Sequence, residues 1–246
     1  MRRSALISLV AALAFAGAFA FAAAGGNKDK DRPAVDVQAA NAQTAKEPSV
    51  HYHVAITLKK AQKPTTLHIR GASSRDRLLA KLEVGTQKGT IMLDSNFLYE
   101  TAPSGIVVLG NFSWLRMNVG RLSPRSQTMS TLRSLTPSPL LRIVAESKLH
   151  VLKGHPIFVG TVAYDDPVVR TALRDLANGY EFRQLHLRVV VGRDGLIHRL
   201  LLEGRSADRK TTFVLRARLF GFGAPVKIPL PKQGTFMDPA LEQLQA

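Results

Sequence analysis

Apolar residues recur at every second position through most of this chain, and this alternation constrains its fold more than any other feature of the sequence. The clearest run begins at Ser49, and its apolar positions are Val50, Tyr52, Val54, Ile56 and Leu58. A period of two places such residues on one face of a β-strand and leaves the intervening residues for the other face. Residues 49–59 are therefore predicted to form a half-buried strand.

The same alternation continues along the first half of the chain, near residues 67–69, 78–84, 91–93, 97–100, 106–109 and 114–119. Short segments rich in Gly, Pro or Ser, which are typical of turns, separate several of these runs at residues 63–64, 71–74 and 85–89. Because the runs follow one another closely, consecutive strands are expected to pair. The first half of the chain is therefore predicted to be an antiparallel meander.

The second half contains further runs of this kind at residues 157–164, 185–191, 196–202 and 212–219. The middle two are the strongest local signal, because the sequence Gly-Arg-Asp-Gly at 192–195 supplies a turn between two alternating segments. They are predicted to form a hairpin. Pairing Val191 with Leu196 in that hairpin would place His186 opposite Leu201.

Helical spacing is confined to a few segments. Residues 35–46 carry Val and Ala at loosely helical spacing and are expected to form a short leading helix. One later helix is expected at residues 140–144, after the start signal Pro137-Ser138-Pro139. A second is expected between the cap Asp165-Asp166-Pro167 and the end signal Asn178-Gly179. Strands are therefore expected to dominate, with two or three helices.

The apolar faces of the predicted strands exceed what so few helices can cover. A single sheet of about eight to eleven strands cannot leave such a face in water, so it must curl around the helices or around something else. Complete cover by the helices would make these residues an ordinary core. Incomplete cover would leave an apolar cavity suited to acyl chains. The periodicity alone leaves both outcomes open.

The first 24 residues have the pattern of an export signal. Arg2 and Arg3 form a positive start, and the residues from Ala5 to Ala24 are apolar or small apart from Ser8. Cleavage is expected near residue 22 or 24, and an uncleaved membrane anchor is the alternative. In either case the rest of the chain is expected outside the cytoplasm, in the periplasm or at the outer face of the cell envelope. Residues 25–47 are expected to form a linker and the leading helix.

Composition narrows the possible functions. The chain has 34 Lys and Arg against 18 Asp and Glu, a formal net charge of +16, and no cysteine. Cysteine chemistry is therefore excluded, including disulfides and attachment of lipid to an N-terminal cysteine. The basic residues are scattered singly and there is one Trp, which argues against nucleic acid as a partner. A solvated sheet face is the simplest interpretation of this charge, and attraction to an anionic membrane surface is the functional alternative.

No pattern of a catalytic site occurs in the sequence, including G-x-S-x-G, H-E-x-x-H and the P-loop, so enzymatic activity is not expected. His51 and His53 lie two residues apart on the polar side of one strand, without an acidic or further His neighbour in sequence. The expected hairpin register also keeps His186 and His198 from being cross-strand neighbours. Neither a metal site nor a cofactor is therefore predicted.

The order of these elements resembles that of a known superfamily. The segments that carry the resemblance are residues 49–54 (SVHYHV), 111–117 (NFSWLRM), 137–141 (PSPLL) and 190–200 (VVGRDGLIHRL). In this order they resemble the LolA-like superfamily, which includes periplasmic lipoprotein carriers and LppX/LprG-type lipid-binding proteins. The chain departs from the anchored members because it lacks a lipobox cysteine, and it has His186 and Arg188 where they have acidic hairpin residues.

The resemblance implies a mainly β (α+β) fold, in which an unclosed antiparallel half-barrel sheet has two or three helices plugging its concave face. It places this domain at residues 48–236, with a C-terminal tail at 237–246. The implied function is that of an exported carrier that binds lipid or the acyl chains of a lipoprotein, without covalent chemistry and as a monomer. The alternative is a cell-envelope interaction domain with a filled core, whose basic face binds an anionic polymer or a protein partner.

The residues expected to line the cavity point inward from the strands, and others would form its lid from the helices. The strand residues are Val54, Ile56, Leu82, Ile91, Leu115, Met117, Leu187, Val189, Leu200 and Leu215. The lid residues are Leu140, Leu141, Val169 and Leu173. The identity of the cargo and the partners that load or unload it do not follow from the sequence.

Overall fold

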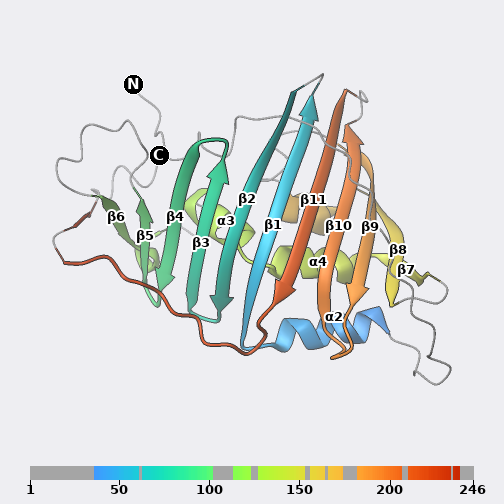
Figure 1. Cartoon of the computed structure of the whole chain (residues 1–246), viewed down its shortest axis with the longest axis horizontal. Coiled ribbons are helices and arrows are strands. Elements are labelled where there is room, and N and C mark those ends of the chain that lie inside the picture. Colours follow the sequence, from blue (N-terminus) through green and yellow to red (C-terminus); the bar gives the residue numbers. More distant parts are fainter. Residues whose placement is uncertain are drawn as a thin grey trace.

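The computed structural model describes residues 36–60, 63–101, 113–122, 127–152, 156–163, 166–173, 182–206, 210–233 and 235–238. Within these residues, twelve strands form one sheet in the order β12-β6-β5-β4-β3-β2-β1-β11-β10-β9-β8-β7 (Figure 1). All neighbours in this order pair antiparallel except β12, which pairs parallel with β6. Because β12 and β7 lie at opposite edges, the sheet is not closed, which confirms the predicted unclosed, mainly β fold.

The strands of the first half form the predicted meander. Their bounds are β1 (Ser49–Lys60), β2 (Lys63–Ser74), β3 (Arg77–Val84), β4 (Gln87–Asp94), β5 (Phe97–Thr101) and β6 (Trp114–Asn118). The strands of the second half are β7 (Lys148–Val151), β8 (Ile157–Ala163), β9 (Phe182–Val191), β10 (Ile197–Ser206), β11 (Thr211–Phe220) and β12 (Phe236–Met237). The strand predicted at 106–109 lies outside the described residues.

Within the described ranges, four α-helices lie on one side of the sheet, one or two more than predicted (Figure 1). They are α2 (Val37–Lys46), α3 (Gln127–Ser134), α4 (Ser138–Glu146) and α5 (Pro167–Leu173), and a short 3-10 helix, η3, spans Val119–Arg121. The predicted cap of α5 is present, since the Asp166 carboxylate accepts hydrogen bonds from the backbone N–H groups of Val168 and Val169 at 2.8 and 3.2 Å. The helix α4 begins after Pro137, which makes no side-chain cap hydrogen bond. The predicted end of α5 at residues 178–179 lies outside the described residues.

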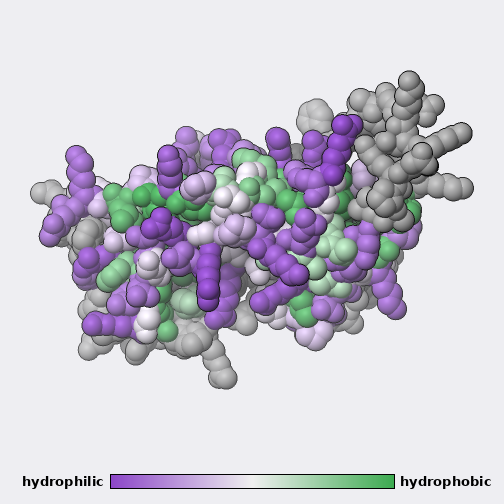
Figure 2. All heavy atoms as spheres, turned by 90° about the horizontal axis from the view of Figure 1, so that it is seen from below, coloured by the Kyte–Doolittle hydropathy of each residue, from purple (hydrophilic) through white to green (hydrophobic). Residues whose placement is uncertain are grey.

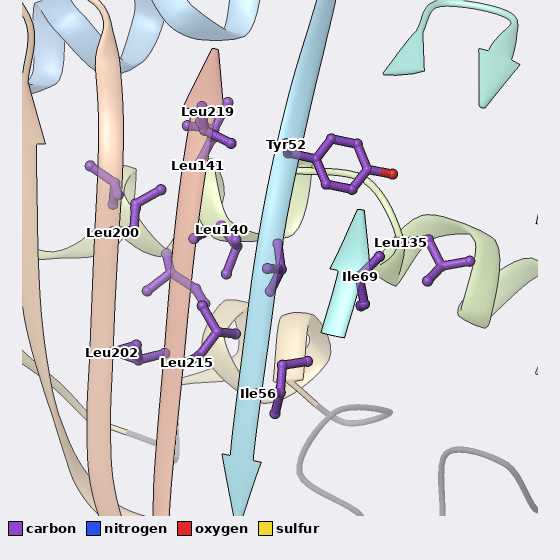
Figure 3. Close-up of a cluster of buried hydrophobic side chains, with 14 of the residues drawn as sticks. Tyr52, Ile56, Ile69, Leu135, Leu140, Leu141, Leu200, Leu202, Leu215 and Leu219 are labelled. Atoms are coloured by element: carbon purple, nitrogen blue, oxygen red, sulfur yellow. The ribbon is translucent and has the colours of Figure 1, made fainter. Parts of the chain in front are cut away.

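Burial follows the predicted alternation. In β1, Tyr52, Val54, Ile56 and Leu58 are buried, whereas His53 between them is exposed. We call the face that carries these buried residues the inner face, because the helices cover it, and the opposite one the outer face. The inner-face residues of strands from β1 to β11 join side chains of α2, α3, α4 and α5 in one hydrophobic cluster (Figure 3).

The hairpin between β9 and β10 forms where predicted, but its predicted register is wrong. Val191 pairs with Ile197 rather than with Leu196, and a bulge follows before Arg199 pairs with Val190. The bulge adds one residue to β10, so that His186 lies opposite Glu203 rather than Leu201. The slip from the predicted register is two residues beyond the bulge, so Leu200 and Leu202 stay on their predicted face. Before the bulge the slip is one residue, so Ile197 lies on the inner face rather than on the predicted outer one.

Three segments predicted as turns belong in whole or in part to strands. Residues 63–64 begin β2 and residues 71–74 continue it, while residues 87–89 begin β4, which leaves Gly85 and Thr86 as the turn. Gly71 pairs with Tyr52, and a Cβ atom at residue 71 would overlap the phenol ring of Tyr52 and the Leu79 carbonyl. A glycine is therefore required here for close packing within a strand rather than for a turn.

Hydrogen bonds hold α2 against the β9–β10 side of the sheet. The Thr44 hydroxyl donates to the Ala40 carbonyl at 2.7 Å and accepts from the buried Ile197 N–H at 2.9 Å. The side-chain amide of Gln38 donates to the Val144 carbonyl of α4 at 3.2 Å. The leading helix predicted from weak spacing is therefore confirmed, and it is an integral part of the packed layer.

The C-terminal segment runs along one end of the sheet, from β11 to β6 (Figure 1, red). The Gly223 N–H donates to the Ser49 carbonyl at 3.0 Å near its start. At its end, Asp238 accepts two hydrogen bonds from the Arg116 guanidinium of β6, at 2.8 and 2.6 Å. Asp238, which the sequence analysis assigned to a tail, is thus attached to the sheet.

Candidate functional site

The residues predicted to line a cavity lie together on the inner face and on the helices that cover it. All of those whose side chains are described are buried. All except Leu115 and Leu173 belong to the single hydrophobic cluster, and Leu115 is buried on β6 beside it. Leu173 is the last residue of α5, and its side chain lies outside the described residues. The structure therefore brings the predicted residues together as one apolar surface.

The helix residues predicted to form a lid come from two helices that contact each other. On α4, Leu140 and Leu141 are buried and lie behind β11 and β1 (Figure 3). On α5, which packs against α4, the side chain of Val169 is fully buried. The helix α4 also contacts α2 and α3, so it connects the whole helical layer.

The inner face is covered most completely over β9, β10 and β11, and we call this part the covered half. Its hydrophobic side chains are at most 4% exposed, and the fully buried ones include Leu185, Val189, Phe213, Leu215 and Leu219. The helix α2 contacts β9 and β10 directly, and α4 lies behind β10 and β11 in Figure 1. Here the helices and the sheet form an ordinary core.

The inner face over β3, β4, β5 and β6 is covered less evenly, and we call this part the meander half. Ala80 and Leu98 are fully buried, but Ile91 is 9% exposed and Leu93 is only partly buried. Gly89, which pairs with Leu82, adds no side chain to the surface. Among the described α-helices, α3 lies behind β2 and β3 in Figure 1, beside this half.

The meander half also contains a carboxyl group that the sequence analysis missed. Glu100 of β5 pairs with Ile91 of β4 and with Leu115 of β6, both of them inner-face residues. Burial among these side chains raises the pKa of the Glu100 carboxyl to about 7. No ion pair among the described residues includes Glu100. Because an unpaired carboxyl in an apolar surface is costly, Glu100 is a candidate contact for a polar group of a ligand.

A second polar group lies on the inner face near the middle of the sheet. The Tyr52 side chain is 1% exposed, and its hydroxyl has no hydrogen-bond partner within the part of the chain that the structure describes. The ring lies against Gly71, with its hydroxyl turned towards the β2 side (Figure 3). Burial raises the pKa of this hydroxyl, so Tyr52 remains an uncharged hydrogen-bond donor at any physiological pH.

The outer face is polar and basic over the middle strands, whereas its β4 and β5 part carries the buried residues Met92 and Tyr99. His53 lies over the middle strands, between Arg70 of β2 and Arg218 of β11. Partial burial and the positive charges of these two arginines lower the pKa of His53, so the ring tends to be neutral at pH 7. The ring meets Phe220 edge to face, with centroids 5.2 Å apart. Among the described residues, no three His, Asp or Glu side chains converge as metal ligands would.

Seen from the end along which the C-terminal segment runs, the molecule presents hydrophobic side chains among hydrophilic ones (Figure 2). The large hydrophobic residues exposed within the described chain are Phe97, Val151, Leu152 and Leu230. Val151 and Leu152 lie at the β7 edge of the sheet, far from Phe97 on β5. No helix in the described ranges has the length and apolar composition needed to cross a membrane. The predicted export signal lies outside those ranges.

Comparison with solved structures finds proteins with a similar arrangement. LprF from Mycobacterium bovis is 13% identical, with a TM-score of 0.44, and the match covers 79% of this chain and 94% of LprF. The lipoprotein LppX from Mycobacterium tuberculosis is also 13% identical, with a TM-score of 0.38 and coverage of 78% and 97%. A DUF1329 family protein from Desulfovibrio piger is 8% identical, with a TM-score of 0.34 and coverage of 78% and 93%.

The TM-scores of these matches lie below 0.5, so they establish neither a family nor a role for this chain. No family model matches the chain, and no curated protein matches it. Any function is therefore inferred from the residues of this chain.

Proposed function

We propose that this protein is an exported, non-enzymatic carrier that binds lipid or the acyl chains of a lipoprotein on the meander half of its inner face. The observation that carries the proposal is the unequal cover of one continuous apolar surface. The covered half is packed by α2 and α4, whereas Ile91 and Leu93 of the meander half retain exposure. An acyl chain would complete that packing, because each buried methylene contributes roughly 0.8 kcal/mol.

The polar groups of the inner face fit a ligand with both apolar and polar parts. Glu100 would accept a hydrogen bond or attract a positive group at the headgroup end, next to Ile91 and Leu115. The Tyr52 hydroxyl would donate to a carbonyl or a phosphate further along the inner face. An isolated polar group in an apolar surface is a common arrangement in sites that orient an amphipathic ligand.

The proposal places the protein outside the cytoplasm, either free in the periplasm or held at the envelope by an uncleaved signal. The apolar stretch at residues 5–24 supports export. A carrier of this kind works as a monomer, because its guest, rather than a second chain, covers the exposed part of its inner face.

The proposal is tested with cis-parinaric acid, an acyl chain whose fluorescence rises in an apolar environment. Protein purified without detergent should bind it saturably. The variant Ile91→Trp places a larger side chain on the meander half and should reduce binding at least tenfold while the protein remains folded. Its control is Val190→Trp, which adds the same side chain at an outer-face position of β9, next to the exposed Arg188, and should bind as the parent does.

Two results would reject the carrier. One is the absence of saturable binding by the folded parent protein. The other is equal binding by the Ile91→Trp and Val190→Trp variants, because a site on the meander half must respond to the first substitution and not to the second.

A further inference from the structure

Four Lys and Arg residues and one His on adjacent strands form one continuous row of register partners across the outer face. In strand order they are Lys81 on β3, Arg70 on β2, His53 on β1, Arg218 on β11 and Arg199 on β10. Each is the direct register partner of the next. Because neighbouring strands lie about 4.8 Å apart, this cationic row spans about 19 Å. The five strands lie side by side in Figure 1.

The side chains of the cationic row are all exposed. The ion pairs found among the described residues join Arg77 to Asp94, Arg116 to Asp238 and His198 to Asp194, and none of them includes a member of the row. The Arg218 guanidinium lies 5.6 Å from the centre of the Phe220 ring, which orients it along the outer face without neutralising it. The row therefore presents the charges of Lys81, Arg70, Arg218 and Arg199 to the surroundings. The pKa of His53 in its middle is lowered by partial burial and by Arg70 and Arg218, so this ring is kept neutral at pH 7.

Such a row destabilises the folded sheet. Like charges directly opposite each other on neighbouring strands repel, whereas alternating charges would stabilise the same sheet. The next row along the strands repeats the pattern in part, since Arg216 of β11 and Arg188 of β9 both lie opposite Leu201 of β10. The acidic residues Glu83 and Glu203 lie one and two rows away from the cationic row.

We propose that the cationic row, with Arg216 and Arg188 beside it, is a docking surface for the anionic headgroups of a lipid bilayer. The basic residues extend in two directions, along the row and across to the next one, as contact with a planar surface requires. A linear polyanion would need only the single row. Lys and Arg held near an anionic bilayer attract it through charge alone, and this attraction weakens as salt is added.

This surface is separate from the inner face, so the inference does not depend on what the inner face holds. Docking through the outer face and binding of an acyl chain on the meander half use opposite sides of one sheet. The two proposals can therefore fail independently, because vesicle binding and uptake of cis-parinaric acid are measured separately.

The test is cosedimentation of the protein with vesicles of phosphatidylglycerol and phosphatidylcholine, compared with vesicles of phosphatidylcholine alone. The parent protein should bind the anionic vesicles and dissociate from them as the salt concentration is raised. The variant with Arg70→Gln, Arg199→Gln and Arg218→Gln should bind at least tenfold more weakly. A variant with Arg→Lys at the same three positions keeps the charge and should retain binding.

The matched control removes three charges from the helical layer, through Lys46→Gln on α2, Arg133→Gln on α3 and Arg142→Gln on α4, all exposed in the structure. It has the same net charge as the Gln variant of the row and should keep most of the parent's binding. Equal losses in the two triple variants would overturn the proposal, since net charge alone would then explain binding. Equal binding of neutral vesicles, or tighter binding of soluble polyphosphate than of anionic vesicles, would overturn it too.

Folding is checked in the same samples by thermal unfolding. Removing repulsion between Arg70, Arg199 and Arg218 should leave the melting temperature of the Gln variant unchanged or raise it. A loss of vesicle binding in a variant that is at least as stable as the parent can then be assigned to the missing charges.

Discussion

The covered half and the meander half of the inner face are built from the same alternating strands but differ in what lies on them. In the covered half, α2 and α4 bring side chains that reduce the exposure of Leu215 and Val189 to zero. In the meander half, Ile91 keeps 9% exposure and Glu100 lies among apolar neighbours. One strand pattern can therefore give either a core or a binding surface, depending on how many helical side chains are available to cover it.

The largest expected effect compares the same substitution in both halves. Leu215→Ala in the covered half should lower the free energy of unfolding by about 3–5 kcal/mol, because the tightly packed surroundings cannot close the cavity. Leu82→Ala, at a position 6% exposed opposite Gly89, should cost at least about 1 kcal/mol less. Urea unfolding of both variants without lipid measures the difference. Equal costs would mean that the two halves are packed alike.

The second prediction concerns Glu100, a carboxyl of the meander half that has no counterpart on the inner face of the covered half. Burial raises its pKa to about 7, so the native state favours the protonated form. The free-energy cost of ionising this carboxyl in the folded protein is absent below about pH 4.5 and grows as the pH rises towards 7. Glu100→Gln should therefore stabilise the protein by roughly 3 kcal/mol above pH 7 and by little at pH 4.

Unfolding measured across this pH range checks the sign as well as the size of the effect. If Glu100→Gln stabilised the protein equally at pH 4 and pH 8, burial would not penalise the charged form of the Glu100 carboxyl, and the prediction would be wrong. Glu83→Gln, at a partly buried site on the outer face of β3, is the matched control, because it removes a carboxyl from the same sheet outside the inner face.

The third prediction tests what holds α2 to the covered half. Thr44→Val removes the hydroxyl that accepts the buried Ile197 N–H, and leaving that donor without a partner should cost about 1–3 kcal/mol. Thr44→Ser keeps the hydroxyl and should retain most of the stability. Hydrogen exchange at the Ile197 amide is the direct measurement. Unchanged protection of that amide in the Val variant would contradict the assigned role.

The smallest effect is expected at the edge of the meander half. Arg116 and Asp238 form a two-bonded ion pair, but their side chains are 28% and 58% exposed. Exposed pairs contribute at most about 1 kcal/mol, so Asp238→Asn should lower the free energy of unfolding by less than that. A larger loss in urea unfolding would indicate that the C-terminal segment does more than close this edge.

Most of the strands could be predicted from the sequence, since each of them buries one face and exposes the other. The sequence was not sufficient for the 3-10 helix η3 or for α3, β7 and β12. The helix α3 is polar along most of its length, β7 is a four-residue edge strand with mostly exposed side chains, and β12 has two residues. Periodicity detects an element only where one of its faces is consistently buried. The hairpin register failed because a bulge is set by local backbone geometry that spacing does not reveal.

The candidate site was predicted in part for the same reason. Its apolar residues follow from alternation, but Glu100 becomes visible as an inner-face carboxyl only when β5 is paired with β4 and β6. The cationic row depends on register even more, because Lys81, Arg70 and Arg218 come from three strands that are distant in the chain or separated by turns. Single basic residues in a sequence look scattered until pairing aligns them.

Native mass spectrometry of the protein purified from its export compartment without detergent tests the central claim most directly. The account predicts that part of the protein carries an added mass that organic extraction releases as an acyl lipid, and that Ile91→Trp lowers this fraction while Val190→Trp does not. A folded protein that appears only at its polypeptide mass, and that takes up no acyl chain when lipid is added, would contradict it.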